Sequence, residues 1–229
     1  MNDTALDDLW VVIPAFNEGA VIADVVHGIK GLCRNVVLID DGSRDETAVH
    51  AESAGALVLR HPINLGQGAA LQTGIDFALR KNAKYVATYD ADGQHDILDL
   101  PPMLNLLKER NLDFVLGSRF IGKTVGMPRS RRILLQAAVL FTRLTTGLRV
   151  TDAHNGLRVF TSRGAKKISL SHNRMAHASE ILEQIAQSKL PYAEFGNTVR
   201  YTEYSRAKGQ KASNAFNIVI DLALGRISK

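Results

Sequence analysis

The sequence predicts an α/β protein whose central sheet is mostly parallel and is flanked by helices. Three observations lead to this fold class: short apolar runs alternate with longer amphipathic stretches in the first half, polar clusters follow several of these runs, and 45% of the residues are hydrophobic against 22% charged. Alternating strand and helix patterns are typical of parallel sheets with helical crossovers. The composition is that of a folded globular protein, and 229 residues suit one domain.

Short apolar runs predict strands, and stretches with helical periodicity predict helices. Pro14 is expected to end the first strand, because its ring removes the backbone donor. Strands are expected at residues 9–13, 36–39, 56–59, 85–89 and 114–116. Helices are expected at 18–32, 68–79 and 100–108, and a further helix that follows residue 43 is expected to end at about residue 54. After residue 117 we expect helices at 131–146, 178–187 and 214–224, and one or two strands within 192–204.

The polar clusters are expected to meet at one edge of the sheet. Asn17-Glu18, Asp40-Asp41 and the segment 90–92 each follow a predicted strand. In open α/β sheets, ligands bind beyond the carboxyl ends of the strands. Simpler roles remain open for two clusters, since Glu18 suits a helix start and Asp41 or Ser43 could cap the helix that follows. The turn at residues 64–68 is interpreted as a strand-to-helix connection rather than a phosphate loop.

Asp90, Asp92 and Gln94 form the most informative pattern. In an extended segment these three side chains point the same way. Two carboxylates and an amide oxygen form a site for a hard cation such as Mg²⁺ or Mn²⁺. Such an ion can bridge the two phosphates of a nucleotide diphosphate. The alternative is an acidic turn that caps the next helix.

Charge is unevenly divided along the chain, although the net charge is only +5. Residues 1–113 contain 9 Lys and Arg against 17 Asp and Glu, whereas residues 114–229 contain 19 against 6. No acidic residue lies between Asp113 and Asp152, a segment that contains Arg119 and Arg131. Such a block favours an anionic partner, either phosphate, acidic lipid or nucleic acid, over a merely solvated basic face.

Several classes are disfavoured. Cys33 is the sole cysteine, which excludes an internal disulfide framework. The longest apolar runs, 133–142 and 215–224, the second of which contains Asp221, are shorter than the roughly 20 residues that a bilayer requires, and no basic start precedes an apolar leader. Only 6% of the residues are aromatic, which argues against a single-strand nucleic-acid binder. A nucleotidyltransferase would carry a glycine-rich basic loop after the first strand, where this chain has Ala15-Phe16-Asn17-Glu18.

Taken together, the motifs resemble glycosyltransferase family 2, which has the Rossmann-like GT-A fold. The motifs are Ile-Pro-Ala-Phe-Asn-Glu at 13–18, Asp-Asp-Gly-Ser at 40–43, Asn-Leu-Gly at 64–66, Asp-Ala-Asp-Gly-Gln-His at 90–95 and Gly-Ser-Arg at 117–119. Within the family, the chain is similar to the polyprenyl-phosphate sugar transferases, typified by dolichyl-phosphate mannose synthase. That similarity continues through Asp152 and the segment 155–158, where Asn155 replaces the usual serine.

The resemblance implies a role for each matching residue. Arg119 and Arg131 would hold the acceptor phosphate, and Arg206 the donor phosphates, with Lys208 or Lys211 assisting. Asp90 and Asp92 would be catalytic together with the two acceptor arginines. The nucleotide sugar would be held by Pro14, Phe16, Glu18, Asp40, Asp41, Asp90, Ala91 and Asp92, and a Mg²⁺ or Mn²⁺ ion by Asp90, Asp92 and Gln94.

The implied reaction is inverting sugar transfer from a GDP- or UDP-linked donor to a polyprenyl phosphate. A single catalytic domain is expected, with a nucleotide-sugar half at 1–118 and an acceptor half with interfacial helices at 119–229. The enzyme is expected to be cytoplasmic and peripheral at the inner membrane face, through its own surface or a membrane-anchored partner, with no nucleic-acid partner and with homo-oligomerisation left open. Leu134, Leu135, Val139 and Phe141 would lie either in the lipid interface or against the core.

The main alternative is a family 2 enzyme with a soluble or glycan hydroxyl acceptor. A hydroxyl nucleophile requires a general base. Glu180 and Glu183 are the candidates, because the second half offers few other acids.

Overall fold

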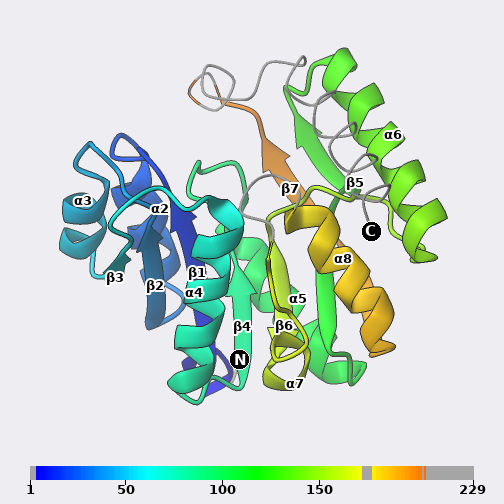
Figure 1. Ribbon diagram of the computed structural model, residues 1–229, viewed down its shortest axis with the longest axis horizontal. Helices are drawn as coiled ribbons and strands as arrows, with labels where there is room; N and C mark the ends of the chain where they lie inside the picture. Colours follow the sequence, from blue (N-terminus) through cyan, green and yellow to red (C-terminus); the bar gives the residue numbers. More distant parts are fainter. Residues whose placement is uncertain (1–3, 172–176, 203, 205–229) are drawn as a thin grey trace.

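The computed structural model describes residues 4–171, 177–202 and 204. Seven strands form one sheet in the order β3-β2-β1-β4-β6-β5-β7 (Figure 1). β6 runs antiparallel to its neighbours β4 and β5, and the other neighbouring pairs are parallel, which confirms the mostly parallel sheet. The strands are β1 (Leu9–Ala15), β2 (Asn35–Asp40), β3 (Leu57–Arg60), β4 (Tyr85–Thr88), β5 (Phe114–Val125), β6 (Arg158–Thr161) and β7 (Tyr192–Arg200).

Helices cover both faces of the sheet (Figure 1). They are α1 (Thr4–Asp7), α2 (Ile22–Lys30), α3 (Thr47–Ser53), α4 (Gln67–Arg80), the 3₁₀ helix η1 (Ile97–Asp99), α5 (Leu100–Glu109), α6 (Arg129–Thr146), α7 (Ser162–Ala165) and α8 (His177–Ser188). The predicted helix at 214–224 lies outside the described residues. α2 begins later than expected, after a turn in which the Glu18 and Gly19 N–H groups donate to Thr47 Oγ1 and Asp45 Oδ2.

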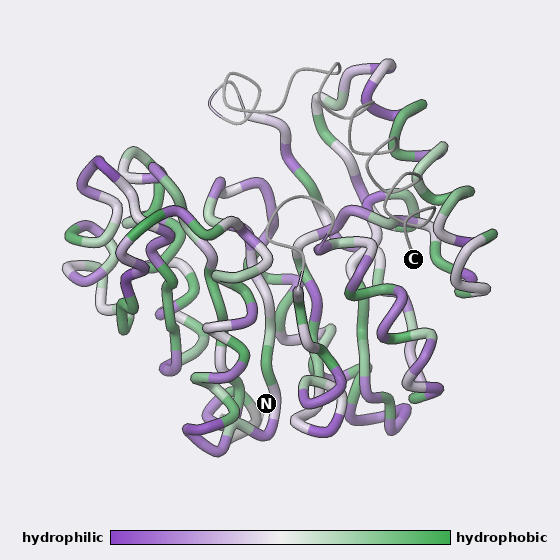
Figure 2. Tube along the Cα trace, in the orientation of Figure 1, coloured by the Kyte–Doolittle hydropathy of each residue, from purple (hydrophilic) through white to green (hydrophobic). Residues whose placement is uncertain are grey.

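Two apolar cores lie on opposite faces of the sheet, as alternation along the strands requires. Val11 and Ile13 pack with α2 and α5 on one face, whereas Val12 packs with α4 and α8 on the other. In Figure 2 the strands between these helices are largely hydrophobic. The rigid two-sided packing of β1, β2 and β4 fixes where the polar segments after them begin.

Pro14 does not end the first strand as predicted. β1 continues to Ala15, and Pro14 pairs in register with Ile39 of β2. The Tyr89 N–H donates to the Val12 carbonyl, so Val12, and Pro14 two residues on, face the β4 side. β4 ends at Thr88, opposite Val12, so the missing donor of Pro14 leaves no ladder bond unmade.

The sequence prediction missed β6 and shortened β5. β6 has only four residues and begins with a buried arginine, so its apolar pattern is weak. β5 was predicted at 114–116 but continues to Val125, because β7 pairs with it along most of its length across an irregularity between Ser118 and Lys123. Its outer half, residues 120–125, is largely exposed, and its apolar and polar residues do not alternate, so it lacks a strand pattern.

Candidate active site

Polar residues at the carboxyl ends of β1, β2 and β4 meet at one edge of the sheet. The Asn17 N–H donates to Ser43 Oγ at 2.8 Å, and the Arg44 N–H donates to Asn17 Oδ1 at 2.9 Å. Glu18 lies near enough to Asp92 for its charge to raise the pKa of that carboxyl group. The three clusters therefore converge, as the strand ends predicted.

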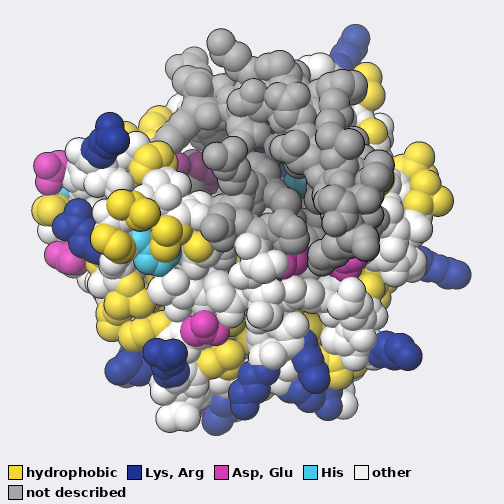
Figure 3. Space-filling model, viewed as in Figure 1, with side chains coloured by type: hydrophobic (Ala, Val, Ile, Leu, Met, Phe, Trp, Pro, Cys, Tyr) yellow, Lys and Arg dark blue, Asp and Glu magenta, His cyan; other side chains and the backbone are white. Residues whose placement is uncertain are grey.

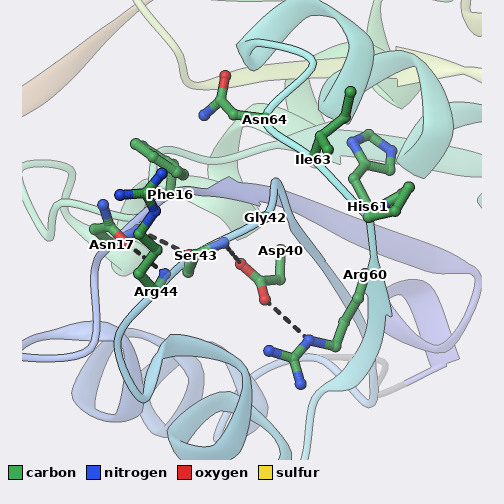
Figure 4. A pocket seen from close by; sticks show the side chains of 11 residues that line it. Phe16, Asn17, Asp40, Gly42, Ser43, Arg44, Arg60, His61, Ile63 and Asn64 are labelled. Carbon is green, nitrogen blue, oxygen red and sulfur yellow. Dashed lines mark hydrogen bonds and ion pairs between the residues drawn. The ribbon is translucent and has the colours of Figure 1, made fainter.

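A cavity of about 740 Å³ opens beyond β1, β2 and β3 (Figure 4). Its size is within the range of sites for small organic ligands. The walls combine an exposed aromatic ring, amides, cations and one buried carboxylate. The lining residues are Phe16, Asn17, Asp40, Gly42, Ser43, Arg44, Arg60, His61, Pro62, Ile63 and Asn64.

Asp40 is fully buried at the floor of this cavity, where two donors orient its carboxylate. The Ser43 N–H donates to Oδ1 at 3.0 Å, and Arg60 Nε donates to Oδ2 at 3.1 Å (Figure 4). Phe16, with 41% of its surface exposed, stands on the opposite side of the cavity as a flat apolar face. Arg44, Arg60 and His61 also line it, and the sequence had indicated none of these three.

Asp41 serves the backbone rather than the cavity. Its carboxylate accepts the N–H groups of Leu65 and Gly66 at 2.9 and 2.7 Å and lies 2.8 Å from His61 Nδ1. Gly66, at φ 98°, then starts α4. Asp41 thus fixes the 64–66 turn, which supports the structural interpretation of that turn. Neither Asp41 nor Ser43 caps α3, where Asp45 accepts the Thr47 N–H instead.

Asp90 and Asp92 follow β4, and the pKa values of their carboxyl groups are shifted in opposite directions. Burial alone would raise the pKa of Asp90, but a hydrogen bond from His95 and the positive charge of Arg158 lower it below its usual value. Burial, followed by the negative charge of Asp90, raises the pKa of Asp92 to about 6. Two neighbouring carboxylates, one of which opposes the ionisation of the other, form a centre that attracts a cation.

The donor set fits a hard divalent cation. Mg²⁺ in nucleotide sites is commonly held by one or two carboxylates together with substrate phosphates, so Asp90 and Asp92 are sufficient protein ligands. Gln94 contacts Asp92, with its N–H 3.1 Å from Oδ1 and its side-chain amide nitrogen 2.7 Å from Oδ2. Its amide would have to turn over to offer oxygen. Within the described part of the chain, no group of three or more His, Cys, Asp and Glu side chains is placed to hold a metal.

Arg119 is buried and forms an ion pair with Asp152. Its Nε donates to Asp152 Oδ2 at 2.6 Å, its Nη1 donates to the Tyr201 hydroxyl at 2.8 Å, and its Nη2 donates to the His154 carbonyl. Only 5% of the Arg119 side chain and none of the Asp152 side chain are exposed. All three guanidinium nitrogens have a protein partner, and each terminal nitrogen carries a second N–H beyond these bonds. The contact of Arg119 with the acceptor phosphate stays a prediction.

Arg131 lies on the outer side of the same cluster. Its guanidinium carbon is 5.1 Å from the centre of the Tyr201 ring, the ring whose hydroxyl accepts from Arg119. A cation over an aromatic face is attracted by the ring electrons. Arg119 therefore orients Tyr201, and Tyr201 orients Arg131.

Arg158, on β6, is a further cation that the sequence analysis did not assign. It is 3% exposed and pairs in register with Thr88, two residues before Asp90. Burial, offset by the charges of Asp90 and Asp152, lowers its pKa to about 10. It remains charged at neutral pH and balances the acidic cluster. The expected donor-phosphate residues Arg206, Lys208 and Lys211 lie outside the described residues.

A mixed sheet with a ligand-sized cavity and an acidic pair at its carboxyl edge is the arrangement of GT-A glycosyltransferases. The sequence model described as "Glycosyl transferase family 2" matches residues 10–172. The chain belongs to this family and is a glycosyltransferase.

Relatives extend the comparison over nearly the whole chain. An uncharacterized protein of Methanocaldococcus jannaschii is 35% identical, over 99% of this chain and 96% of its own length. The UDP-N-acetylglucosamine–dolichyl-phosphate N-acetylglucosaminyltransferase of Methanococcus voltae is 29% identical, over 96% of this chain and 97% of its own. Among solved structures, glucosyl-3-phosphoglycerate synthase of Mycobacterium tuberculosis with Mn²⁺, UDP-glucose and phosphoglyceric acid superimposes with a TM-score of 0.71 at 18% identity, covering 96% of this chain and 80% of that one.

Proposed function

We propose that this enzyme transfers a sugar from a nucleoside diphosphate sugar to the phosphate of a polyprenyl lipid. The observation that carries the proposal is the end-to-end similarity to the M. voltae transferase, whose name specifies a UDP-sugar donor and a dolichyl-phosphate acceptor. The site chemistry supports it from two sides, through an acidic pair for the donor and a cationic cluster for the acceptor.

On the donor side, the nucleoside occupies the cavity between Phe16 and Asp40. The ring of Phe16 offers a stacking face, and Asp40, oriented by Arg60, accepts hydrogen bonds from a base or ribose. Asp90 and Asp92 would hold Mg²⁺ or Mn²⁺, which would neutralise the negative charge of the departing diphosphate. Glu18 lies near Asp92, and the Tyr204 hydroxyl donates to its Oε2 at 2.8 Å.

On the acceptor side, the nucleophile is a phosphate oxygen. A phosphate monoester has a second pKa of about 6 and is largely dianionic near neutrality, so it attacks without a general base. Inversion at the anomeric carbon follows from this single displacement. The chain's contribution is to bring two anions together, and Arg131, stacked on Tyr201, faces the approaching phosphate. Arg119 acts indirectly by holding Tyr201.

The rival hydroxyl acceptor would need a base in the second half. Glu180 is 9% exposed and accepts hydrogen bonds from the Ser171 N–H and hydroxyl at 2.9 and 2.7 Å, which ties it to the segment before α8. A residue in this position is a structural acceptor. Glu183 is the remaining candidate, and the assay below includes it.

We place the acceptor lipid beside α6. Leu135 and Val139 of this helix are buried at 8% exposure each and pack on the core, whereas Ile133, Leu140 and Leu144 are 68%, 59% and 78% exposed. These three recur at helical spacing and form one apolar stripe, flanked by Arg129 and Arg132. Hydrophobic and basic side chains gather along this edge in Figure 3, and Figure 2 traces the same alternation along α6. An amphipathic basic helix of this kind lies on an anionic membrane surface.

Nothing in the described ranges resembles a membrane-spanning helix, in length or in apolar content. Peripheral attachment at the inner face, through α6 or with a membrane-anchored partner, is a separate part of the proposal and is based on the exposed apolar stripe of α6. The two halves on either side of residue 118 share one sheet, since β4 of the first half pairs with β6 of the second.

The test is a transfer assay with radiolabelled UDP- and GDP-sugars, Mn²⁺ or Mg²⁺, and a polyprenyl phosphate in detergent. We expect label to enter the organic phase in the wild type and in Glu183→Gln, and to remain in the aqueous phase in Asp92→Asn. Equal incorporation with an unphosphorylated polyprenol, or loss of all transfer in Glu183→Gln, would favour a hydroxyl acceptor and overturn the proposal.

A further inference from the structure

A buried run of side chains joins Asp90 to the Arg119 cluster. His95 Nε2 lies 3.2 Å from Asp90 Oδ2, and His95 Nδ1 lies 3.1 Å from Asn197 Nδ2. Asn155 Nδ2 donates to Asn197 Oδ1 at 2.9 Å and to Asp152 Oδ2 at 3.3 Å. The two asparagines come from β7 and from the loop before β6, and they are 42 residues apart in sequence.

The orientation of the Asn155 amide is fixed by chemistry at both of its ends. The Leu157 N–H, 3.1 Å away, can only donate, so the Asn155 atom facing it is the oxygen. Asp152 is held ionised, because the Arg119 charge and hydrogen bonds overcome burial and lower the pKa of its carboxyl group. An ionised carboxylate only accepts, so the Asn155 atom facing Asp152 is the nitrogen.

The orientation passes from Asn155 to Asn197 and then to His95. Because the Asn155 nitrogen donates to Asn197, the Asn197 atom that accepts this hydrogen bond must be its oxygen. The Asn197 nitrogen therefore faces His95 Nδ1. An amide nitrogen is only a donor, so Nδ1 must carry the lone pair. In the neutral ring the proton then resides on Nε2, which faces Asp90.

Water cannot replace these contacts. Asn197, Asn155 and His95 are 0%, 3% and 7% exposed, so an unmatched pair of donors would remain unsatisfied inside the protein. Two glycines leave the space that Asn155 and Asp90 occupy. A Cβ on Gly117 would lie 2.8 Å from Asn155 Oδ1, and one on Gly156 would overlap the Asp90 carboxylate.

We infer that Asn155 and Asn197 are positioning residues that lock His95 in the tautomer protonated at Nε2, so that it donates to Asp90. The opposite tautomer would set an N–H against the Asn197 amide and a lone pair against the Asp90 carboxylate. Asp90 thereby receives a hydrogen bond at Oδ2, which holds its carboxylate in one orientation. The role for the donor rests on the proposed function, but the tautomer itself is a property of the resting protein.

The test is the tautomer of His95, measured by long-range ¹H–¹⁵N NMR on ¹⁵N-histidine protein at about pH 8, without donor or lipid. The His95 signals are assigned by their loss in His95→Gln. We expect a protonated Nε2 and a bare Nδ1 in the wild type. Asn197→Asp keeps the shape and the acceptor for Asn155 but turns the group facing His95 into an acceptor, so we expect a proton on Nδ1, with or without one on Nε2.

Asn111→Asp is the matched control, since Asn111 is exposed and follows α5, and it should leave the His95 signals unchanged. A wild-type ring protonated at Nδ1 would overturn the inference, whether or not Asn197→Asp folds. A folded Asn197→Asp protein with wild-type His95 signals would also overturn it. If the tautomer is as expected and no sugar reaches polyprenyl phosphate, then the proposed function fails and this inference stands.

Discussion

Removing the charge of Asp152 is expected to destabilise the fold by a large fraction of its total stability. Asp152 Oδ2 accepts from the backbone and side chain of Arg119 at 3.1 and 2.6 Å and from Asn155 at 3.3 Å, while Oδ1 accepts from the His154 N–H at 3.2 Å. Asp152→Asn preserves the shape but leaves the 5%-exposed Arg119 with no countercharge. Breaking a buried ion pair on one side costs about 3–5 kcal/mol. Domains of this kind are stable by only about 5–15 kcal/mol.

The assay is urea unfolding followed by circular dichroism. The matched control is Asp8→Asn, since Asp8 pairs with Lys84 at 2.8 Å with 41% and 68% of the two side chains exposed. Such surface pairs contribute about 0–1 kcal/mol. The double variant Arg119→Met with Asp152→Leu should recover part of the loss, because it leaves no unpaired charge. If Asp152→Asn costs no more than Asp8→Asn, the claim that Arg119 is a buried structural cation is wrong.

Three further predictions follow from the same geometry. The contribution of Asp152 to the free energy of unfolding should depend on pH, because the pKa of its carboxyl group is lowered in the folded protein. The difference in free energy of unfolding between wild type and Asp152→Asn should be largest above the unfolded pKa of about 4 and should decrease as the pH falls through the folded pKa. Urea midpoints measured from pH 7 to 3 check this. Gly156→Ala should abolish most sugar transfer, because its Cβ would overlap the Asp90 carboxylate, and a variant with wild-type turnover would contradict that packing. Leu144 is 78% exposed, and Leu144→Glu should reduce the fraction of protein that sediments with anionic vesicles severalfold without changing the thermal midpoint. The control Val49→Glu, at a position 49% exposed on α3, should leave that fraction unchanged. Equal sedimentation of the two variants would count against α6 as the membrane surface.

The sequence predicted what local patterns determine. The apolar runs before Asp40 and Asp90 located β2 and β4 within a residue or two, and the parallel arrangement then implied that their polar ends meet. β6 could not be read this way, because a four-residue strand that starts with Arg158 has no alternation. Its insertion between β4 and β5 depends on pairing across long stretches of chain.

The candidate site was predictable in kind but not in the roles of individual side chains. The family resemblance made Arg119 a candidate phosphate ligand, but it could not show that Arg119 pairs with Asp152, 33 residues away, and that the pair is buried. Asp41 likewise serves a turn 24 residues downstream. Whether a charged side chain meets a ligand or another side chain depends on such distant contacts, which composition and spacing do not encode.

The central claim is that Asp90 and Asp92 gather a divalent cation with the donor diphosphate. Isothermal titration of the wild type and of Asp92→Asn with UDP and GDP, each with and without Mn²⁺, tests it most directly. We predict that one of the nucleotides binds the wild type much more tightly with Mn²⁺ and that Asp92→Asn loses this dependence. Binding that is indifferent to Mn²⁺ in the wild type, or unchanged by Asp92→Asn, would contradict the account.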